Sequence, residues 1–325
     1  MKILAVDDDP SLLELIPMIL AEAGMTDVTV ANSAENALSV ISEQSEPFEC
    51  FLLDIQMPGR SGIELCGDIR KLPGYSQTPI IMLTAMQEKV FIDDAFMAGA
   101  TDYITKPFDF SEVSARLGMA KLLVKEQKKV RDLAAQASKS NEDTDANSKP
   151  DFNERFDLGG VKGLVSIQAF ENYLNQLSRA GYQSSRFFAI HMQDALGIFE
   201  RCTASEFDYA LRHVADGISV SYQSGAVVMC YIGNGNFICS SNAAELYTTA
   251  QLEDAIQDIL DDKNLTYDDG NPLDIEVAIG AAVQPLLSNV SQLEDLETLA
   301  VKRAMIRAGE KNSKPNLVNI KHVRI

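Results

Sequence analysis

The sequence predicts two domains, first an open doubly wound α/β fold and then an α+β fold with an antiparallel sheet. Up to about residue 130, short apolar runs alternate with amphipathic helical patterns, which indicates parallel strands covered by helices on both faces. Beyond a polar stretch the order becomes strand, helix, strand, strand, helix, strand, which is typical of an antiparallel sheet with helices on one face. A chain of 325 residues is long enough for two domains.

The first domain is expected to contain a five-stranded parallel sheet. Its strands are the mostly apolar runs at residues 3–6, 28–31, 50–53, 80–83 and 103–105. Its helical patterns start near Ser11, Ser33, Gly62, Gln87 and Phe110. In such a sheet, ligands bind at the carboxyl ends of the strands, near the point where the strand order reverses.

The last helical pattern continues past the first domain. Its apolar stripe consists of Val113, Leu117, Ala120, Val124, Val130 and Leu133. Such a stripe can pair with a second chain or lie on its own domain, and the sequence leaves both open. Residues 138–150 carry no apolar side chain except one alanine and the closing proline, which is typical of a flexible linker. The expected boundaries are 1–125 for the first domain, 126–151 for the helix extension and linker, and 152–325 for the second domain.

The second domain shows helical patterns and short apolar runs in alternation. The helices are expected at residues 166–180, 205–222, 243–260 and 293–308. The strands are expected at residues 187–192, 226–232, 237–239, 275–282 and 316–320. Asn234-Gly235 between two apolar strands predicts a type I′ hairpin turn.

Charge and cysteine content exclude several classes of function. The net charge of −19 gives no general attraction for nucleic acid or an anionic membrane, so neither is an expected partner. Five cysteines without CxxC spacing, and an N-terminus without a signal peptide, favour the reducing cytoplasm. The three histidines lack the spacing of metal ligands, so no zinc site is expected.

Three kinds of polar group follow the expected strands of the first domain. They are the carboxylates of Asp7-Asp8-Asp9 and Asp54, the hydroxyl of Thr84 and the ammonium group of Lys106. Taken singly, an acidic run can cap a helix, a threonine can be satisfied locally, and Lys-Pro can form a turn. Because they end different strands of one sheet, together they can hold a divalent cation and a phosphoryl group on one aspartate.

Asp54 is the expected phosphoacceptor. A carboxylate attacks phosphorus poorly unless a cation neutralises the repulsion between the two anions. Mg²⁺ prefers oxygen ligands, keeps several waters and usually takes one or two carboxylates. We expect Asp8 to bind it directly and Asp7 to bind it through water. Asp54 itself and the backbone carbonyl of Gln56 complete the expected set.

The remaining groups are expected to bind the phosphoryl oxygens and to respond to them. Lys106 would pair with one oxygen as a point charge, and Thr84 would donate its hydroxyl to another. The peptide bond before Pro107 can be cis, which would hold Lys106 in place. Tyr103 lies two residues before Thr105 and is expected to swing inward when Thr84 moves.

These residues make the first domain similar to a response-regulator receiver domain. The matching segments are Val6-Asp7-Asp8-Asp9, Leu53-Asp54-Ile55-Gln56-Met57-Pro58-Gly59, Leu83-Thr84-Ala85, Gly99-Ala100-Thr101-Asp102-Tyr103 and Lys106-Pro107-Phe108. The resemblance covers about residues 1–125 and implies a flavodoxin-like fold. It also implies phosphotransfer from a histidine kinase to Asp54, a Mg²⁺ requirement, and a change coupled through Thr84 and Tyr103 in the face of the fourth and fifth helices.

The second domain resembles, in outline, a GGDEF domain, the module that makes cyclic di-GMP from two GTP. The matching segments are Leu158-Gly159-Gly160-Val161-Lys162-Gly163-Leu164, Phe170, Ile279-Gly280 and Ala304-Met305-Ile306-Arg307-Ala308. The resemblance spans about residues 158–320 and implies a nucleotidyl-cyclase-like fold with a ferredoxin-like βαββαβ core.

The functional residues of that family are missing from this chain. The signature hairpin reads Gly233-Asn234-Gly235-Asn236-Phe237, so that Gly235 and Asn236 replace the two signature acids. His191 falls where the family has its first metal-binding aspartate, and the R-x-x-D product site is absent near residues 224–227. Two-metal phosphoryl chemistry requires carboxylates at fixed places, so cyclase activity is not expected.

The sequence therefore favours a response regulator whose phosphorylation at Asp54 acts through a non-catalytic second domain. That domain is expected to work by dimerisation or by contact with an unknown downstream protein, and a homodimer is the expected assembly. Three alternatives stay open. They are a sensor that binds GTP or cyclic di-GMP without turnover, an active cyclase with unusual ligands, and a phosphate sink.

Overall fold

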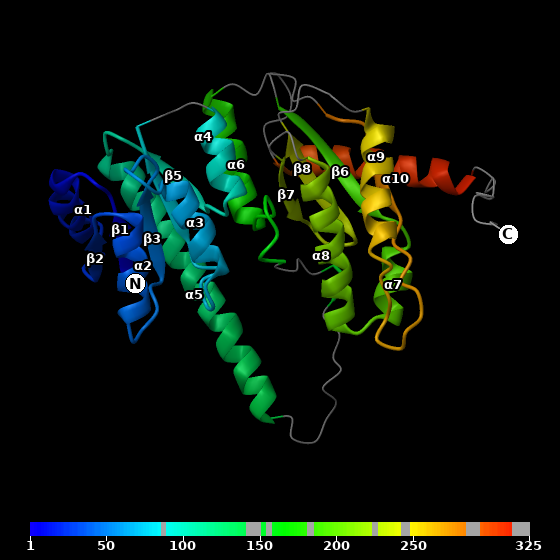
Figure 1. Cartoon of the computed structure of the whole chain (residues 1–325), viewed down its shortest axis with the longest axis horizontal. Helices are drawn as coiled ribbons and strands as arrows, with labels where there is room; N and C mark the ends of the chain where they lie inside the picture. The colour runs from blue at the N-terminus through cyan, green and yellow to red at the C-terminus, as the bar shows by residue number, and fades with distance from the viewer. Residues whose placement is uncertain are drawn as a thin grey trace.

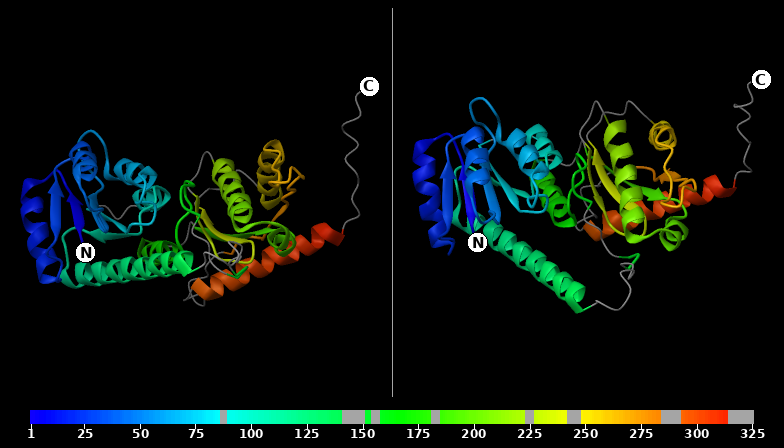
Figure 2. Two further views of the ribbon diagram at one scale, coloured as in Figure 1. Left: turned by 90° about the horizontal axis from the view of Figure 1, so that it is seen from below. Right: turned by 60° about the horizontal axis from the view of Figure 1, so that its bottom comes forward.

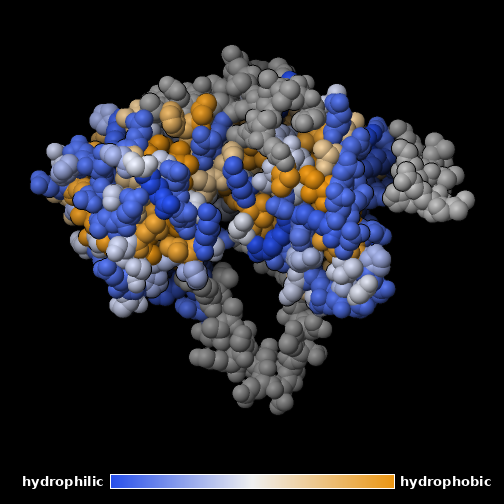
Figure 3. Space-filling view, in the orientation of Figure 1, coloured by the Kyte–Doolittle hydropathy of each residue, from blue (hydrophilic) through white to orange (hydrophobic). Residues whose placement is uncertain are grey.

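The computed structural model describes residues 1–85, 89–140, 151–153, 158–180, 185–222, 227–241, 248–283 and 293–313. These residues form two halves that lie side by side, each built around one sheet (Figure 1). Among the described residues, no helix has the length and apolar character needed to cross a membrane. Hydrophilic residues cover much of the visible surface of both halves, with apolar residues showing between them (Figure 3).

The first half is an open sheet with five parallel strands in the order β2-β1-β3-β4-β5, which confirms the doubly wound prediction. The strands are β1 (Ile3–Val6), β2 (Val28–Ala31), β3 (Cys50–Asp54), β4 (Ile80–Thr84) and β5 (Asp102–Thr105). The helices are α1 (Pro10–Glu22), α2 (Ala34–Glu43), α3 (Gly62–Lys71), α4 (Lys89–Met97) and α5 (Phe110–Ser140). One apolar cluster packs α2, α3 and α4 on one face of the sheet, and another packs α1 and α5 on the opposite face.

Helix α5 continues well past the sheet, as its apolar pattern predicted (Figure 2). Val113, Leu117 and Ala120 are buried against the first half, so this part of the stripe covers its own domain. The side chains of Val130 and Leu133 lie outside the described residues, as does the segment 141–150. Pairing of α5 with a second chain therefore stays a prediction.

The second half contains a four-stranded antiparallel sheet in the order β7-β8-β6-β9. The strands are β6 (Arg186–Met192), β7 (Val227–Tyr231), β8 (Asn236–Ser241) and β9 (Val277–Ile279). The helices are α6 (Ile167–Ala180), α7 (Ala195–Arg201), α8 (Ala204–Ser221), α9 (Thr249–Asp262) and α10 (Leu293–Ser313). The strand expected at 316–320 lies outside the described residues, and the short helix α7 was not predicted.

Helices cover both faces of this second sheet, so the prediction of a single covered face is wrong. Phe187 and Ala189 of β6 belong to the apolar cluster that includes α6 and α10. Phe188, Ile190 and Met192 belong to the cluster that includes α8 and α9. The cause is visible in the sequence, because β6 is apolar at nearly every position instead of every second one, and such a strand is buried on both faces.

Candidate functional site

Three carboxylates meet at the carboxyl end of the first sheet. Asp7 follows β1 and Asp54 ends β3, and these neighbouring strands pair with Val6 opposite Leu53. Asp7 is 1% exposed and Asp54 5% exposed, whereas Asp8 lies on the surface. The three side chains each offer an oxygen within 4.8 Å of the others. The observed strand order therefore brings together the acids that the sequence singled out.

Lys106 lies between two of these carboxylates. Its Nζ donates to Asp54 Oδ1 at 2.6 Å and to Asp7 Oδ2 at 2.7 Å. Its backbone N–H donates to the carbonyl oxygen of Thr84 at 2.7 Å, which fixes Lys106 beside the end of β4. The Lys106–Pro107 peptide bond is cis, one of the two forms that the sequence left open.

Thr84 and Tyr103 lie on the two strands beside this cluster. Thr84 ends β4 and is buried, one residue beyond the position that pairs with Asp54. Tyr103 on β5 is also buried, in the apolar cluster that contains Phe96 of α4. In this structure Tyr103 is therefore already inside, and its predicted movement with Thr84 stays a prediction.

The charges at this site shift its pKa values in a definite direction. Burial raises the pKa of Asp54, Lys106 opposes the rise, and the nearby charges of Asp7 and Asp8 add to it. Burial alone would lower the pKa of Lys106, but its hydrogen bonds and charge pairing with Asp54 and Asp7 raise it overall. Lys106 is thus held in its charged form beside a carboxylate cluster that has an excess of negative charge.

The donor set fits a magnesium ion. All three groups are oxygen ligands, and the exposure of Asp8 leaves access for the waters that Mg²⁺ retains. Both oxygens of Asp7 already have donors, since Asp9 N donates to Oδ1 and Lys106 to Oδ2. Asp8 is accordingly the most accessible ligand, while Gln56, two residues past β3, is exposed. The individual ligand roles of these residues stay predictions.

Gly62 is a positioning residue that the sequence reasoning missed. It starts α3, and its N–H donates to the carbonyl oxygen of Ile55 at 3.1 Å. A Cβ at this position would lie 1.9 Å from the backbone oxygen of Asp54, so only glycine lets α3 approach the end of β3 so closely. The signal in the sequence was the capping box of Ser61 and Glu64, which marks where the helix begins.

The hairpin of the second half at residues 233–237 forms the predicted tight turn. Asn236 N donates to the carbonyl oxygen of Gly233 at 2.9 Å, and β8 begins at Asn236. The two central residues, Asn234 and Gly235, have φ values of 53° and 70°. Positive φ at both central positions is what a type I′ turn requires. Phe237, the residue that follows this turn, is fully buried.

The side chains around this hairpin form a neutral and closely packed cluster. His191 Nδ1 lies 3.0 Å from Asn236 Oδ1, so the proton on Nδ1 is donated across the β6–β8 pair. Burial lowers the pKa of His191 more than Asn236 raises it, which favours the neutral ring. A Cβ on Gly235 would lie 2.3 Å from Cβ of Ala195 at the start of α7. Position 235, where the resemblance to a GGDEF domain implies an acid, therefore has no room for a side chain.

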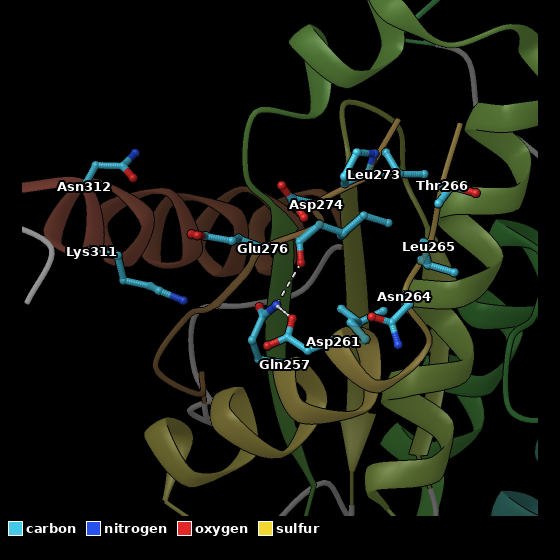
Figure 4. Close-up of a pocket in the computed structure, with 13 residues that line it drawn as sticks. Gln257, Asp261, Asn264, Leu265, Thr266, Leu273, Asp274, Glu276, Lys311 and Asn312 are labelled. Atoms are coloured by element: carbon cyan, nitrogen blue, oxygen red, sulfur yellow. Dashed lines mark hydrogen bonds between the residues drawn. The ribbon is translucent and has the colours of Figure 1, made fainter. Parts of the chain in front are cut away.

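A separate hollow lies between α9, the loop that follows it and α10 (Figure 4). Its polar side chains are largely engaged with the protein itself. Gln257 Nε2 donates to Asp261 Oδ1 at 2.8 Å and to the carbonyl oxygen of Ile275 at 2.9 Å. Lys311 Nζ donates to the carbonyl oxygen of Val277 at 2.9 Å. Within the part of the chain that the structure describes, the acidic group of Asp7, Asp8 and Asp54 is the one candidate metal site.

Comparison with known proteins assigns the first half. Residues 3–118 match the family described as response regulator receiver domain. The transcriptional regulatory protein YvrH of Bacillus subtilis (strain 168) is 38% identical over 116 residues, which cover 36% of this chain and 47% of that protein. The DNA-binding response regulator MtrA of Mycolicibacterium smegmatis is 39% identical over 116 residues, 36% of this chain and 48% of that protein. This chain thus spans about half the length of these curated relatives.

Solved receiver structures are similar to the same half. Chemotaxis protein CheY4 of Vibrio cholerae has 29% identity and a TM-score of 0.35, and the match covers 37% of this chain and 97% of that one. The receiver domain of the Francisella response regulator 1452 has 31% identity and a TM-score of 0.34, and the match covers 39% of this chain and 98% of that one. From the family match, residues 3–118 are a response-regulator receiver domain.

Proposed function

We propose that this chain is a phosphorylation-dependent response regulator of a two-component system, with Asp54 as its phosphoacceptor. The donor would be a histidine kinase or a phosphotransfer protein. The observation that carries the proposal is the contact of Lys106 Nζ with Asp54 Oδ1 at 2.6 Å, beside the carboxylates of Asp7 and Asp8. When all four groups are ionised, three carboxylates and one ammonium group leave a net charge of −2, which suits a divalent cation.

The chemistry that this arrangement supports is phosphoryl transfer to a carboxylate. One oxygen of Asp54 attacks the phosphorus of a phosphohistidine, a P–O bond forms as the P–N bond breaks, and the imidazole nitrogen leaves with the electron pair and takes up a proton. Lys106 offsets the negative charge that gathers on the phosphoryl oxygens, and Thr84 supplies a hydroxyl donor. Magnesium, when bound, supplies the remaining positive charge.

For the second half we propose a GGDEF-like output domain without catalytic activity. The strand and helix order from β6 to β9 supports the outline, because α7 and α8 lie between β6 and β7, and α9 lies between β8 and β9. The neutral contact between His191 and Asn236, and the close approach of Ala195 to Gly235, support the loss of metal binding. Such a domain would act through dimerisation or through contact with a downstream protein. The five cysteines are all free thiols, which supports a reducing cytoplasmic location for the whole chain.

The test is the mass and shape of the full chain, measured by light scattering with beryllofluoride and Mg²⁺. Beryllofluoride stands in for the phosphoryl group on Asp54. We expect a change in the wild type and none in an Asp54→Asn variant. If a kinase labels Asp54 but neither mass nor shape changes, the output part of the proposal is wrong, and the phosphate-sink alternative is favoured.

Retained nucleotide binding is the alternative for the second half, and calorimetry separates it from the proposal. We expect no heat when GTP or cyclic di-GMP is added to the full chain, with or without Mg²⁺, because the hairpin has no carboxylate to hold a metal. Saturable heat with either nucleotide would favour a sensor instead.

A further inference from the structure

A cavity of about 870 Å³ lies between the receiver and the segment that leads into α6. One wall comes from α3 and from the residues that join α4 to β5, and the opposite wall comes from residues 159–169 (Figure 1). The described residues that line it include none of the carboxylates, the lysine or the threonine of the candidate phosphoacceptor site. A volume in this range is typical of small-molecule sites, which often form between domains.

Helix α6 holds the two walls side by side, because it packs against both halves of the molecule. Its neighbours are α4 and β5 of the receiver and β7 of the second sheet. Tyr173 Oη donates to Asp93 Oδ1 of α4 at 2.9 Å, and the Tyr173 ring packs edge-on against Phe96 with 5.3 Å between ring centroids. Gly163 N donates to the carbonyl oxygen of Met97, the last residue of α4, at 3.1 Å. The cavity is therefore formed before a ligand enters, which reduces the cost of ordering its walls on binding.

The interior of the cavity offers apolar surface from both walls. Several of its apolar side chains are only partly buried by the protein, and these include Ile63, Met97, Leu123, Val161, Leu164 and Val165. Gly67 of α3 also lines the cavity, and a Cβ at this position would meet nothing within 4 Å. Covering partly exposed apolar surface is favourable, so the cavity suits a ligand with an apolar body.

The charged side chains of the cavity favour an anionic group on that ligand. Four cationic and three acidic side chains line it, which gives a local charge of +1 in a chain whose net charge is −19. They are Arg60, Arg70, Lys71 and Lys162, with Glu64, Asp68 and Asp94.

Lys162 is the cation best placed to meet such a group. Asp68 already pairs with Arg60 at 2.9 Å and with Lys71 at 3.4 Å. Glu64 Oε2 accepts from Ser61 N at 2.9 Å in the cap of α3. Lys162 is exposed and takes part in no ion pair among the described residues.

We propose that this cavity binds a small amphipathic anion, an aromatic or short acyl carboxylate, with its apolar body between the two walls and its anionic group beside Lys162. Because both halves line the cavity, a ligand that fills it stabilises their side-by-side arrangement by its binding free energy. The chain would then respond to a chemical input that does not pass through Asp54. This inference is independent of the proposed role of Asp54.

The test uses two fluorescent probes with the full chain. The first is 8-anilinonaphthalene-1-sulfonate, an amphipathic anion, and the second is N-phenyl-1-naphthylamine, which has the same aromatic body without the sulfonate. Both are expected to bind the wild type saturably at one site per chain. Gly67→Phe fills the cavity and should weaken both probes by about tenfold or more. Gly118→Phe on α5 also has open space but lies outside the lining, so it is the matched control and should bind both probes as the wild type does.

A charge reversal tests the anionic part of the proposal. Lys162→Glu should weaken the sulfonate probe by about tenfold and leave the neutral probe unchanged. Lys121→Glu makes the same change of charge on the exposed face of α5, outside the cavity lining, and should affect neither probe. Since Lys162 is exposed, this variant keeps the test decisive if Gly67→Phe does not fold.

Hydrogen exchange shows whether both walls hold the probe. The sulfonate probe is expected to slow exchange in the peptides of α3 and of residues 159–166 together. The proposal is overturned if the wild type shows no saturable binding, or if a folded Gly67→Phe variant binds both probes unchanged, since they would then occupy another surface. It is also overturned if Lys162→Glu weakens both probes equally or neither, or if exchange slows on one wall alone.

Discussion

The two halves of this molecule place polar residues at comparable strand ends but use them differently. In the receiver, Asp7, Asp54 and Lys106 form a charged cluster next to the exposed Asp8. In the second half, His191 and Asn236 form a neutral pair under a closed turn. The comparison shows that the charges and the space at the strand ends set the chemistry of each half.

The packing around one glycine in each half also differs between the two sites. In the receiver, Gly62 permits a close approach of α3 to the Asp54 backbone, while the Asp54 side chain contacts Lys106. In the second half, Gly235 permits a close approach of α7 that fills the space a side chain would need. The same residue type thus supports a site in one half and closes it in the other.

The largest expected effect concerns the charged site. Asp54→Asn removes the nucleophilic carboxylate, so labelling by a kinase or by acetyl phosphate should be lost completely. The measurement is the mass gain of the intact protein. Asp9→Asn is the matched control, because Asp9 caps α1 by accepting from Ser11 N at 2.8 Å and asparagine caps a helix equally well. Equal labelling of Asp54→Asn and wild type would place the phosphoacceptor elsewhere.

The next effect tests the glycine of the receiver. Gly62→Ala places a Cβ against the Asp54 backbone, so the free energy of unfolding should fall by about 3 kcal/mol or more. Gly67→Ala, on the same helix with open space around it, should instead raise it by about 0.5–1 kcal/mol. Urea unfolding of both variants gives the comparison. A Gly62→Ala variant as stable as Gly67→Ala would mean that the close approach is not needed.

A third prediction concerns a variant in which the neutral cluster of the second half is made acidic. The double variant His191→Asp and Asn236→Glu restores two acids but leaves Gly235 closed against Ala195. We expect no cyclic di-GMP from GTP and Mg²⁺ by chromatography, and a loss of about 2 kcal/mol or more in stability, because two acids are placed in a buried site. Asn234→Asp, exposed in the same hairpin, should change stability by less than about 0.5 kcal/mol. Product formation by the double variant would show that charge alone separates the two halves.

The smallest effect is a pH dependence of stability. Because burial raises the pKa of Asp54 above its ordinary value of 3.8, the folded state binds this proton more tightly than the unfolded state. Ionisation of Asp54 therefore costs stability as the pH rises above about 4. Asp54→Asn should be more stable than wild type near pH 7, and this advantage should shrink toward about pH 3, where Asp54 is protonated in both states. An advantage that is equal at both pH values would rule out ionisation as its cause.

The sequence predicted the charged site more fully than the neutral one. Asp54, Thr84 and Lys106 each end or follow an apolar strand run, and parallel strands bring such ends together without further information. What the structure adds to this prediction is the side-chain geometry, in which Lys106 contacts both Asp7 and Asp54. In the second half, the turn at Asn234-Gly235 was predictable because local backbone preferences decide it.

What the sequence did not predict depends on contacts between distant segments. That Ala195 fills the space beside Gly235 can be known only once the start of α7 is known. The N-cap residue of this helix, Asp194, makes no capping hydrogen bond with its side chain. The docking of α6 was also missed. Tyr173 and Asp93 are 80 positions apart, and Tyr173 is an ordinary member of an amphipathic stripe until its partner is known.

The shared helix α6 has a consequence for dividing the chain. A fragment that ends after α5 would keep every residue of the proposed phosphoacceptor site. It would expose Asp93 and Phe96, which Tyr173 now covers. Such a fragment would present to water, and to other copies of itself, a surface that the intact chain keeps inside. Ending the chain after α5 therefore changes the surface of the receiver. A different output domain fused at that point would leave this surface uncovered unless it contained a helix that packs in the place of α6.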